Sequence, residues 1–132
     1  MFDAAATAEF VQRLLALPFL LMGVSHVVQP ALWRRYFNDL GAGGRTAVIT
    51  RSFLLELWPA AIIVAFHQVW SGWAVILTVY GHLLGAKVSL SLLVPSIGLR
   101  SLEQAERGDA GFRAAGVVLI GLGLLCLALL AG

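Results

Sequence analysis

Two ionisable side chains, Glu56 and His82, lie deep inside long apolar runs, where charge is costly and usually serves binding or proton transfer. Counted at ~1.5 Å per residue from the ends of their runs, both fall near the middle. A short link joins the two runs, so antiparallel neighbouring helices would let the carboxylate and the imidazole meet. Pro59 predicts a kink just beyond Glu56, which makes room for water or a ligand. A Glu56–His82 pair is therefore a chemically sensible site for binding a ligand or relaying protons, and contact between the two side chains stays open.

Two more charged candidates lie closer to the ends of their runs. Lys87 is five residues beyond His82, about 140° further round a helix, and its long stem reaches towards the interface. Arg13 lies near the start of the first run and reaches the opposite interface. A structural role, in which buried charges only fix the helix register, stays open beside ligand binding. The candidate ligand-binding or proton-relay residues are Arg13, Glu56, His82 and Lys87, and no catalytic residue is assigned.

The composition indicates an integral membrane protein with one domain, residues 1–132. Hydrophobic residues make up 60% of the chain and charged residues 12%, with a mean hydropathy of +0.90. Ordinary soluble domains carry roughly 25% charged residues. The formal charge of +2 is too small to indicate nucleic-acid binding. The single cysteine, Cys126, excludes an intrachain disulfide.

Four apolar runs determine the predicted fold class. They cover about 8–29, 46–68, 72–95 and 112–131, and each is close to the ~20 residues that a helix needs to cross a bilayer. The alternating pattern of a membrane-spanning β-barrel does not occur in the sequence. We therefore predict an all-α fold, a four-helix transmembrane bundle with a short interfacial amphipathic helix after helix 1.

The interfacial helix is predicted from the loop after the first run. Pro30 suits a first helical turn and Gly41 suits the end of a helix. The spacing of Trp33, Tyr36, Phe37 and Leu40 places all four side chains on one face. Such a helix lies at the membrane surface, as an anchor or as a docking site for a partner.

Arginine placement predicts the orientation in the membrane. The loops 29–45 and 96–113 contain three arginines each, whereas the link 67–72 contains none. Basic loops stay in the cytoplasm. We expect a multi-pass protein of the bacterial inner (cytoplasmic) membrane with both termini on the outer, periplasmic side. A short connector helix is also expected around 101–107.

Short motifs resemble the DoxX-like family of small four-helix membrane proteins. They are Arg13-Leu14-Leu15 and Gly23-Val24-Ser25-His26 in the first run, and Phe53-Leu54-Leu55-Glu56 in the second. The resemblance implies quinone-linked sulfur oxidation or membership of a membrane redox assembly. It also implies that Arg13 and Glu56 act as a pair.

These observations lead to three functional hypotheses. The first is a small accessory subunit of a bacterial redox or energy-converting membrane complex, because little chain is left for an extramembrane domain. The alternatives are a stand-alone quinone-linked oxidoreductase or quinone-binding protein, and a small-solute carrier. The expected partners are the lipid bilayer and other membrane subunits or further copies of the chain. Quinone is the possible cofactor. A b-type haem is not expected, because the three histidines fall at different depths. No metal centre is expected, because no close cluster of ligands occurs.

Overall fold

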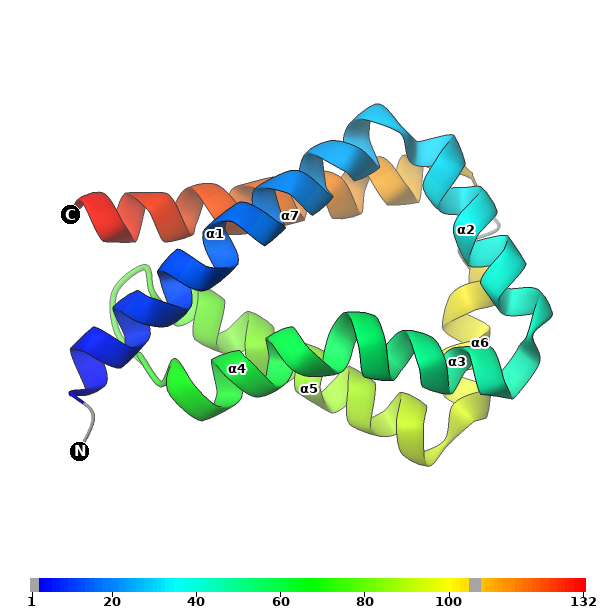
Figure 1. Ribbon diagram of the computed structural model, residues 1–132, viewed down its shortest axis with the longest axis horizontal. Helices are drawn as coiled ribbons and strands as arrows, with labels where there is room; N and C mark the ends of the chain where they lie inside the picture. Colours follow the sequence, from blue (N-terminus) through cyan, green and yellow to red (C-terminus); the bar gives the residue numbers. More distant parts are fainter. Residues whose placement is uncertain (1–2, 105–107) are drawn as a thin grey trace.

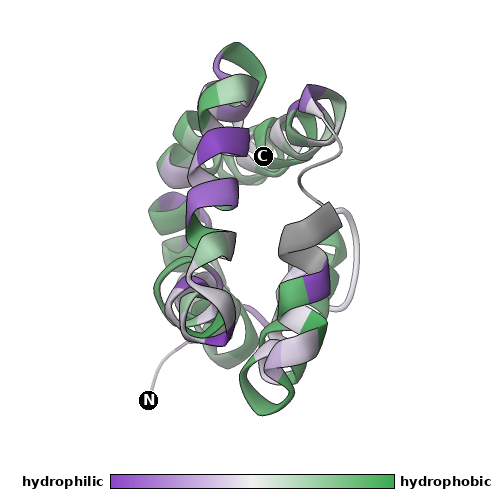
Figure 2. Ribbon diagram, turned by 90° about the vertical axis from the view of Figure 1, so that its right-hand side faces the viewer, coloured by the Kyte–Doolittle hydropathy of each residue, from purple (hydrophilic) through white to green (hydrophobic). Residues whose placement is uncertain are grey.

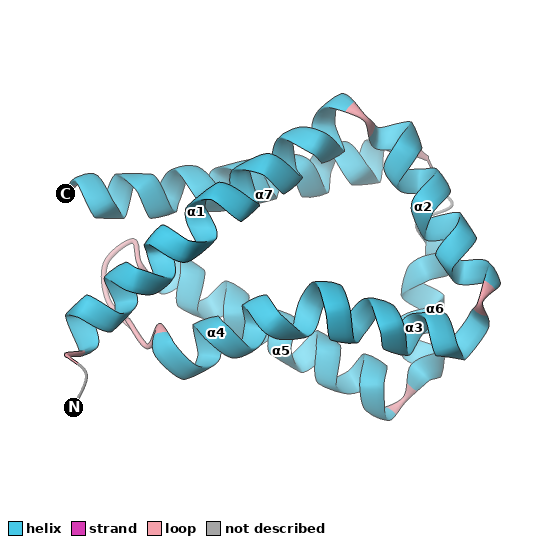
Figure 3. Ribbon diagram, in the orientation of Figure 1, coloured by secondary structure: helices cyan, strands magenta, loops and turns pink. Residues whose placement is uncertain are grey.

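The computed structural model describes residues 3–104 and 108–132, and within these ranges it contains helices and short connections but no strand (Figure 3). The all-α prediction is therefore confirmed for the described chain. In order, the elements are α1 (Ala4–Val28), α2 (Pro30–Ala42), α3 (Gly44–Arg51), the π-helix η1 (Ser52–Leu57), α4 (Trp58–Phe66), α5 (Val75–Leu93), α6 (Pro95–Gln104) and α7 (Asp109–Ala131).

Four helical stretches are long and apolar enough to cross a membrane. They are Ala4–Val28, Gly44–Phe66, Val75–Leu93 and Asp109–Ala131. The second is continuous through α3, η1 and α4. Their ends differ from the predicted runs by only a few residues. Large apolar side chains such as Leu83 are exposed on the outer faces of these helices, which suits a hydrocarbon environment.

The long helices form two antiparallel pairs (Figure 1). In the first pair α1 packs along α7, and in the second the continuous helix from α3 to α4 packs along α5. We call the end where α2 and α6 join the pairs the connecting end. The opposite end, where α1 begins and α7 ends, is the terminal end (Figure 1). There α1 also contacts α4, and the two pairs share a buried core formed by Val11, Leu15, Ala16, Phe19, Ile63, Leu77, Leu122 and Cys126.

Glycines allow α1 and α7 to approach within backbone contact. A Cβ atom on Gly23 would lie 2.7 Å from the carbonyl oxygen of Gly116, and one on Gly116 would lie 2.7 Å from that of Gly23. A Cβ atom on Gly123 would lie 2.6 Å from Cγ of the Leu20 side chain. Side chains at these positions would overlap the partner helix. Close approach through small residues is a common way to join helices in membranes.

The connecting end is the polar end of the molecule. Helix α2 begins at Pro30 and continues to Ala42, which confirms the amphipathic helix predicted after the first run. Its hydrophilic turns are prominent when the molecule is viewed from this end (Figure 2). Helix α6 begins at Pro95, earlier than the connector helix predicted around 101–107. The predicted part at 105–107 lies outside the described residues.

Candidate functional site

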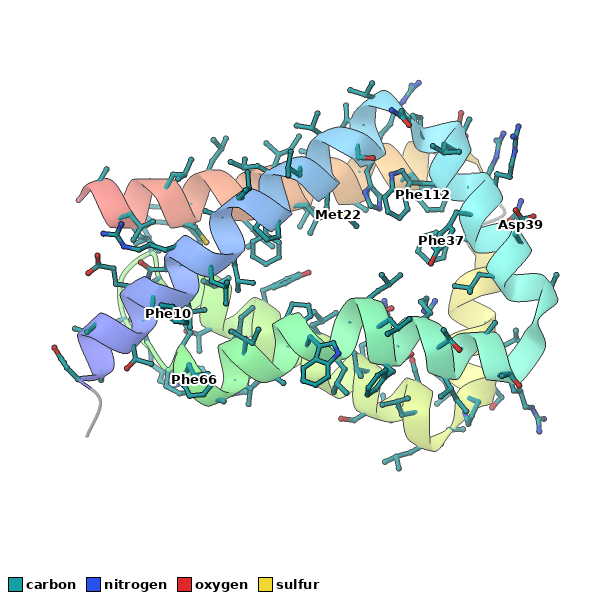
Figure 4. All side chains as sticks on the ribbon, in the orientation of Figure 1. Phe10, Met22, Phe37, Asp39, Phe66 and Phe112 are labelled. Atoms are coloured by element: carbon teal, nitrogen blue, oxygen red, sulfur yellow. The ribbon has the colours of Figure 1, made fainter. Side chains whose placement is uncertain are left out.

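A cavity of about 450 Å³ lies between the two helix pairs. Ligand pockets typically enclose roughly 300–1,000 Å³ and combine apolar walls with a few polar groups. This cavity has that composition, and Figure 4 shows Met22 and Phe37 extending towards the space between the pairs. The lining residues are Leu15, Pro18, Phe19, Met22, His26, Trp33, Phe37, Leu55, Glu56, Pro59, Tyr80, Leu84, Lys87, Ala115, Val118 and Leu119.

Glu56 forms the charged part of the cavity wall. Its Oε1 lies 3.1 Å from Nε of Arg51, and its Oε2 lies 3.0 Å from Nζ of Lys87. The Arg51 side chain is 3% exposed, whereas the Lys87 side chain is 49% exposed. A buried charge is tolerated only when it is paired. The carboxylate is therefore held between a fully buried guanidinium and an ammonium group that is open to the cavity.

A local change of helix type brings Arg51 and Glu56 together. Residues five apart differ by about 140° in an α-helix, so their side chains would diverge. The segment Ser52–Leu57 is instead a π-helix, whose i to i+5 hydrogen bonds stack residues five apart. Pro59 lies two residues after the end of this segment, and a proline ring clashes with the carbonyl four residues earlier in a regular α-helix. A kink was predicted just beyond Glu56, whereas the distortion lies around it: the widened turn covers Ser52–Leu57 and brings Arg51 and Glu56 together.

Aromatic side chains close the cavity at the connecting end. The His26 and Trp33 rings stack with centroids 4.2 Å apart, and Nε1 of Trp33 donates to the Ser25 hydroxyl over 2.8 Å. Phe37 packs on Phe112 of α7 with ring centroids 5.5 Å apart (Figure 4). Part of the apolar face of α2, predicted as an anchor or docking surface, therefore covers the cavity.

The hydrogen bond of His26 fixes its tautomer. Nδ1 lies 2.6 Å from the carbonyl oxygen of Met22. Because a carbonyl only accepts hydrogen bonds, Nδ1 carries a proton and donates. His26 therefore contributes either no charge or one positive charge to the cavity.

The structure places His82 apart from Glu56, whose ion pairs go to Arg51 and Lys87. Nδ1 of His82 donates to the Thr78 carbonyl over 2.9 Å, and its ring lies 5.2 Å from that of Trp70. The helical phase explains this result. Lys87 lines the cavity from α5, and His82 is about 140° away on the same helix. The expected Glu56–His82 pair is thus replaced by Glu56–Lys87.

Arg13 also lies away from the charged wall. Its Nη2 is 2.5 Å from Oε1 of Glu9, one turn earlier on α1, and its side chain is 65% exposed. The pair of Arg13 with Glu56 that the family resemblance implies does not form in this structure. Of the four predicted site residues, only Glu56 and Lys87 come together.

A buried polar network at the terminal end was not predicted. Nε2 of Gln12 lies 3.1 Å from Nε2 of His67, and Nδ1 of His67 lies 3.0 Å from the Thr78 hydroxyl. Because the amide nitrogen only donates, His67 accepts at Nε2 and donates from Nδ1. The hydroxyl in turn donates to the Val69 carbonyl over 2.7 Å. The network fastens α1 to the α4–α5 connection.

Burial also sets the charge of His67. The side chain is fully buried, and desolvation lowers its pKa from the usual 6.5, against a smaller opposing effect of a backbone hydrogen bond. The neutral form satisfies both ring nitrogens in the network. Little in the sequence pointed to this network, because Gln12 is an uncharged residue within an apolar run.

Comparison with known proteins found no matching family model, curated protein or solved structure. The DoxX-like resemblance therefore stays a prediction from short motifs, and the functional argument depends on the geometry of this chain.

Proposed function

We propose that this protein spans the membrane and binds a lipid-soluble molecule with a polar head in the cavity between its helix pairs. The observation that supports the proposal is the Glu56–Lys87 ion pair on the wall of an otherwise apolar cavity of about 450 Å³. Apolar walls hold the body of such a molecule, and the ammonium group of Lys87 donates hydrogen bonds to its polar atoms. Quinones, with carbonyl oxygens on an apolar ring and tail, are one class that fits.

We further propose that the connecting end faces the cytoplasm of a bacterium and the terminal end faces the periplasm. Arg34 and Arg35 on α2 and Arg100 on α6 support this orientation, because basic connections are retained on the cytoplasmic side. The connection at the terminal end between Phe66 and Val75 contains neither lysine nor arginine.

A cavity-filling variant tests the binding function. Ala115 lines the cavity from α7, whereas Ala114 beside it is exposed and lies outside the lining. A short-chain ubiquinone analogue should quench the tryptophan fluorescence of the purified protein in a saturable manner. Ala115→Phe should weaken this binding about tenfold, equivalent to about 1.4 kcal/mol, and Ala114→Phe should leave it unchanged. Absence of saturable quenching in both the natural chain and Ala114→Phe would reject quinone as the bound class.

A second function is an accessory subunit of a bacterial redox or energy-converting membrane complex. It is favoured by the small part of the described chain outside the four long helices, namely α2, α6 and short connections. Native mass spectrometry after gentle extraction from the source membrane tests it. A stoichiometric assembly with larger redox subunits would support this role, whereas a chain found only alone or with its own copies would contradict it.

A further inference from the structure

The charges around the cavity do not balance. Glu56 is the only carboxylate among the described residues that line it, and Lys87 is the lining ammonium. Arg51 lies directly behind Glu56, with Nε 3.1 Å from Oε1. These three groups together carry one net positive charge. His26 adds no negative charge in either protonation state, because both forms of imidazole are neutral or positive.

The surplus charge can be assigned to Lys87. A guanidinium stays charged in proteins, and that of Arg51 is buried against Glu56, so it neutralises the carboxylate permanently. The Lys87 ammonium also contacts Glu56, but its side chain is 49% exposed and lines the cavity. An ammonium group carries several N–H donors. Contact with one carboxylate oxygen leaves further donors for a ligand.

An unbalanced positive charge beside apolar walls favours a negatively charged partner. Lys87 and Arg51 share the single carboxylate of Glu56, and an anionic ligand that enters the cavity supplies the second counter-charge. The volume of about 450 Å³ suits one molecule of ordinary ligand size rather than a lipid with two long chains. Tyr80 lines the same wall and offers a hydroxyl donor.

We infer that the ligand of the cavity is a single-chain lipophilic acid whose anionic head contacts Lys87, while Arg51 and Glu56 position the ammonium group. The inference rests on the proposed binding function and specifies the class of molecule. Glu56 and Arg51 are positioning residues, and Lys87 is the residue that touches the ligand.

A matched pair of probes tests the inference. The full chain is placed in phosphatidylcholine nanodiscs, which carry no acidic lipid, and tryptophan quenching is measured with dibromostearate and with its methyl ester. The two probes share one tail and differ in head-group charge. Quenching that rises with probe concentration without saturating is taken as partition into the bilayer and subtracted. The acid should bind at least about tenfold more tightly than the ester, a difference of about 1.4 kcal/mol.

Variants at Lys87 identify the contact. Lys87→Met should remove the preference for the acid, and Lys87→Arg, which retains the positive charge, should preserve it. Both variants leave the buried Arg51–Glu56 pair intact, so both should fold. Equal binding of acid and ester by the natural chain would overturn the inference and leave the binding function standing. If the acid, the ester and the quinone analogue all fail to bind saturably, the binding function itself is rejected. An acid preference that survives in Lys87→Met would also overturn the inference.

Discussion

Both helix pairs contain a close glycine contact, at Gly23–Gly116 in the first and at Gly81–Ile63 in the second, and the second pair adds a charged cluster. In the α1–α7 pair the backbones touch through Gly23 and Gly116, and the contact depends on shape. In the second pair a π-helix replaces regular helix so that Arg51 and Glu56 meet, and Lys87 of α5 completes the cluster. The difference separates two roles. The first pair is a close-packed scaffold, and the second accepts an irregular helix in order to carry charge beside a cavity.

The largest loss of stability is expected when Glu56, in the second helix pair, loses its permanent counter-charge Arg51. Arg51→Met keeps an apolar stem of similar length but leaves Glu56 with the half-exposed Lys87 alone. Removal of one partner from a buried ion pair costs about 3–5 kcal/mol. Thermal unfolding in detergent should therefore show a large loss of stability.

A double variant sharpens this test. Arg51→Met combined with Glu56→Leu removes both charges, and replacement of a whole buried pair by apolar groups is often neutral. The double variant should recover most of the lost stability. If it unfolds as easily as Arg51→Met alone, the ion pair is not the reason for the loss.

A smaller effect is expected in the scaffold pair. Gly116→Leu forces a side chain into the α1 backbone, and overpacking of this kind costs about 1–3 kcal/mol. Gly121 lies on the same helix, but a side chain there would meet no neighbouring element within 4 Å of its Cβ atom. Gly121→Leu should therefore change the unfolding temperature little, within about 0.5 kcal/mol. Equal destabilisation by the two changes would show that the glycine contact does not hold the pair together.

The smallest change in stability is expected from the His67 hydrogen-bond network, which joins α1 to the second helix pair. Burial lowers the pKa of His67 from 6.5 in the folded chain, so below about pH 6.5 the unfolded chain binds more protons than the folded chain. The network therefore stabilises the folded chain fully above pH 6.5, and this stabilisation is lost as the pH falls through the lowered pKa of His67. The unfolding temperature should drop more between pH 7 and pH 5 in the natural chain than in His67→Gln. An identical drop in both would contradict the assignment.

The sequence was informative where a property repeats along the chain. The lengths of the apolar runs predicted the four long helices, and Pro30 with the spacing of Trp33 and Phe37 predicted α2. The depth of Glu56 in its run identified it as the centre of the buried charge. Each of these conclusions depends on regular helical geometry, which the structure retains in those segments.

The partners of Glu56 could not be predicted in the same way. A π-helix changes the angular position of every following residue, so a periodicity of 3.6 residues places Arg51 on the wrong side of Glu56. Depth along the helix also favoured His82 over Lys87 as the partner of Glu56. The long side chain of Lys87 nevertheless reaches the carboxylate from a different depth. Pro59 was the available signal, since it marks where the regular helix is interrupted.

The α1–α7 contact also has a consequence for the order of assembly. Because synthesis runs from the N-terminus, α1 emerges first and α7 last, so the earliest helix must wait for its main packing partner until the end. Helices α4 and α5 are close in the chain and are able to pair much sooner. Arg51, Glu56 and Lys87 can therefore come into contact while the ribosome is still at work, before the glycine-packed scaffold closes over the cavity.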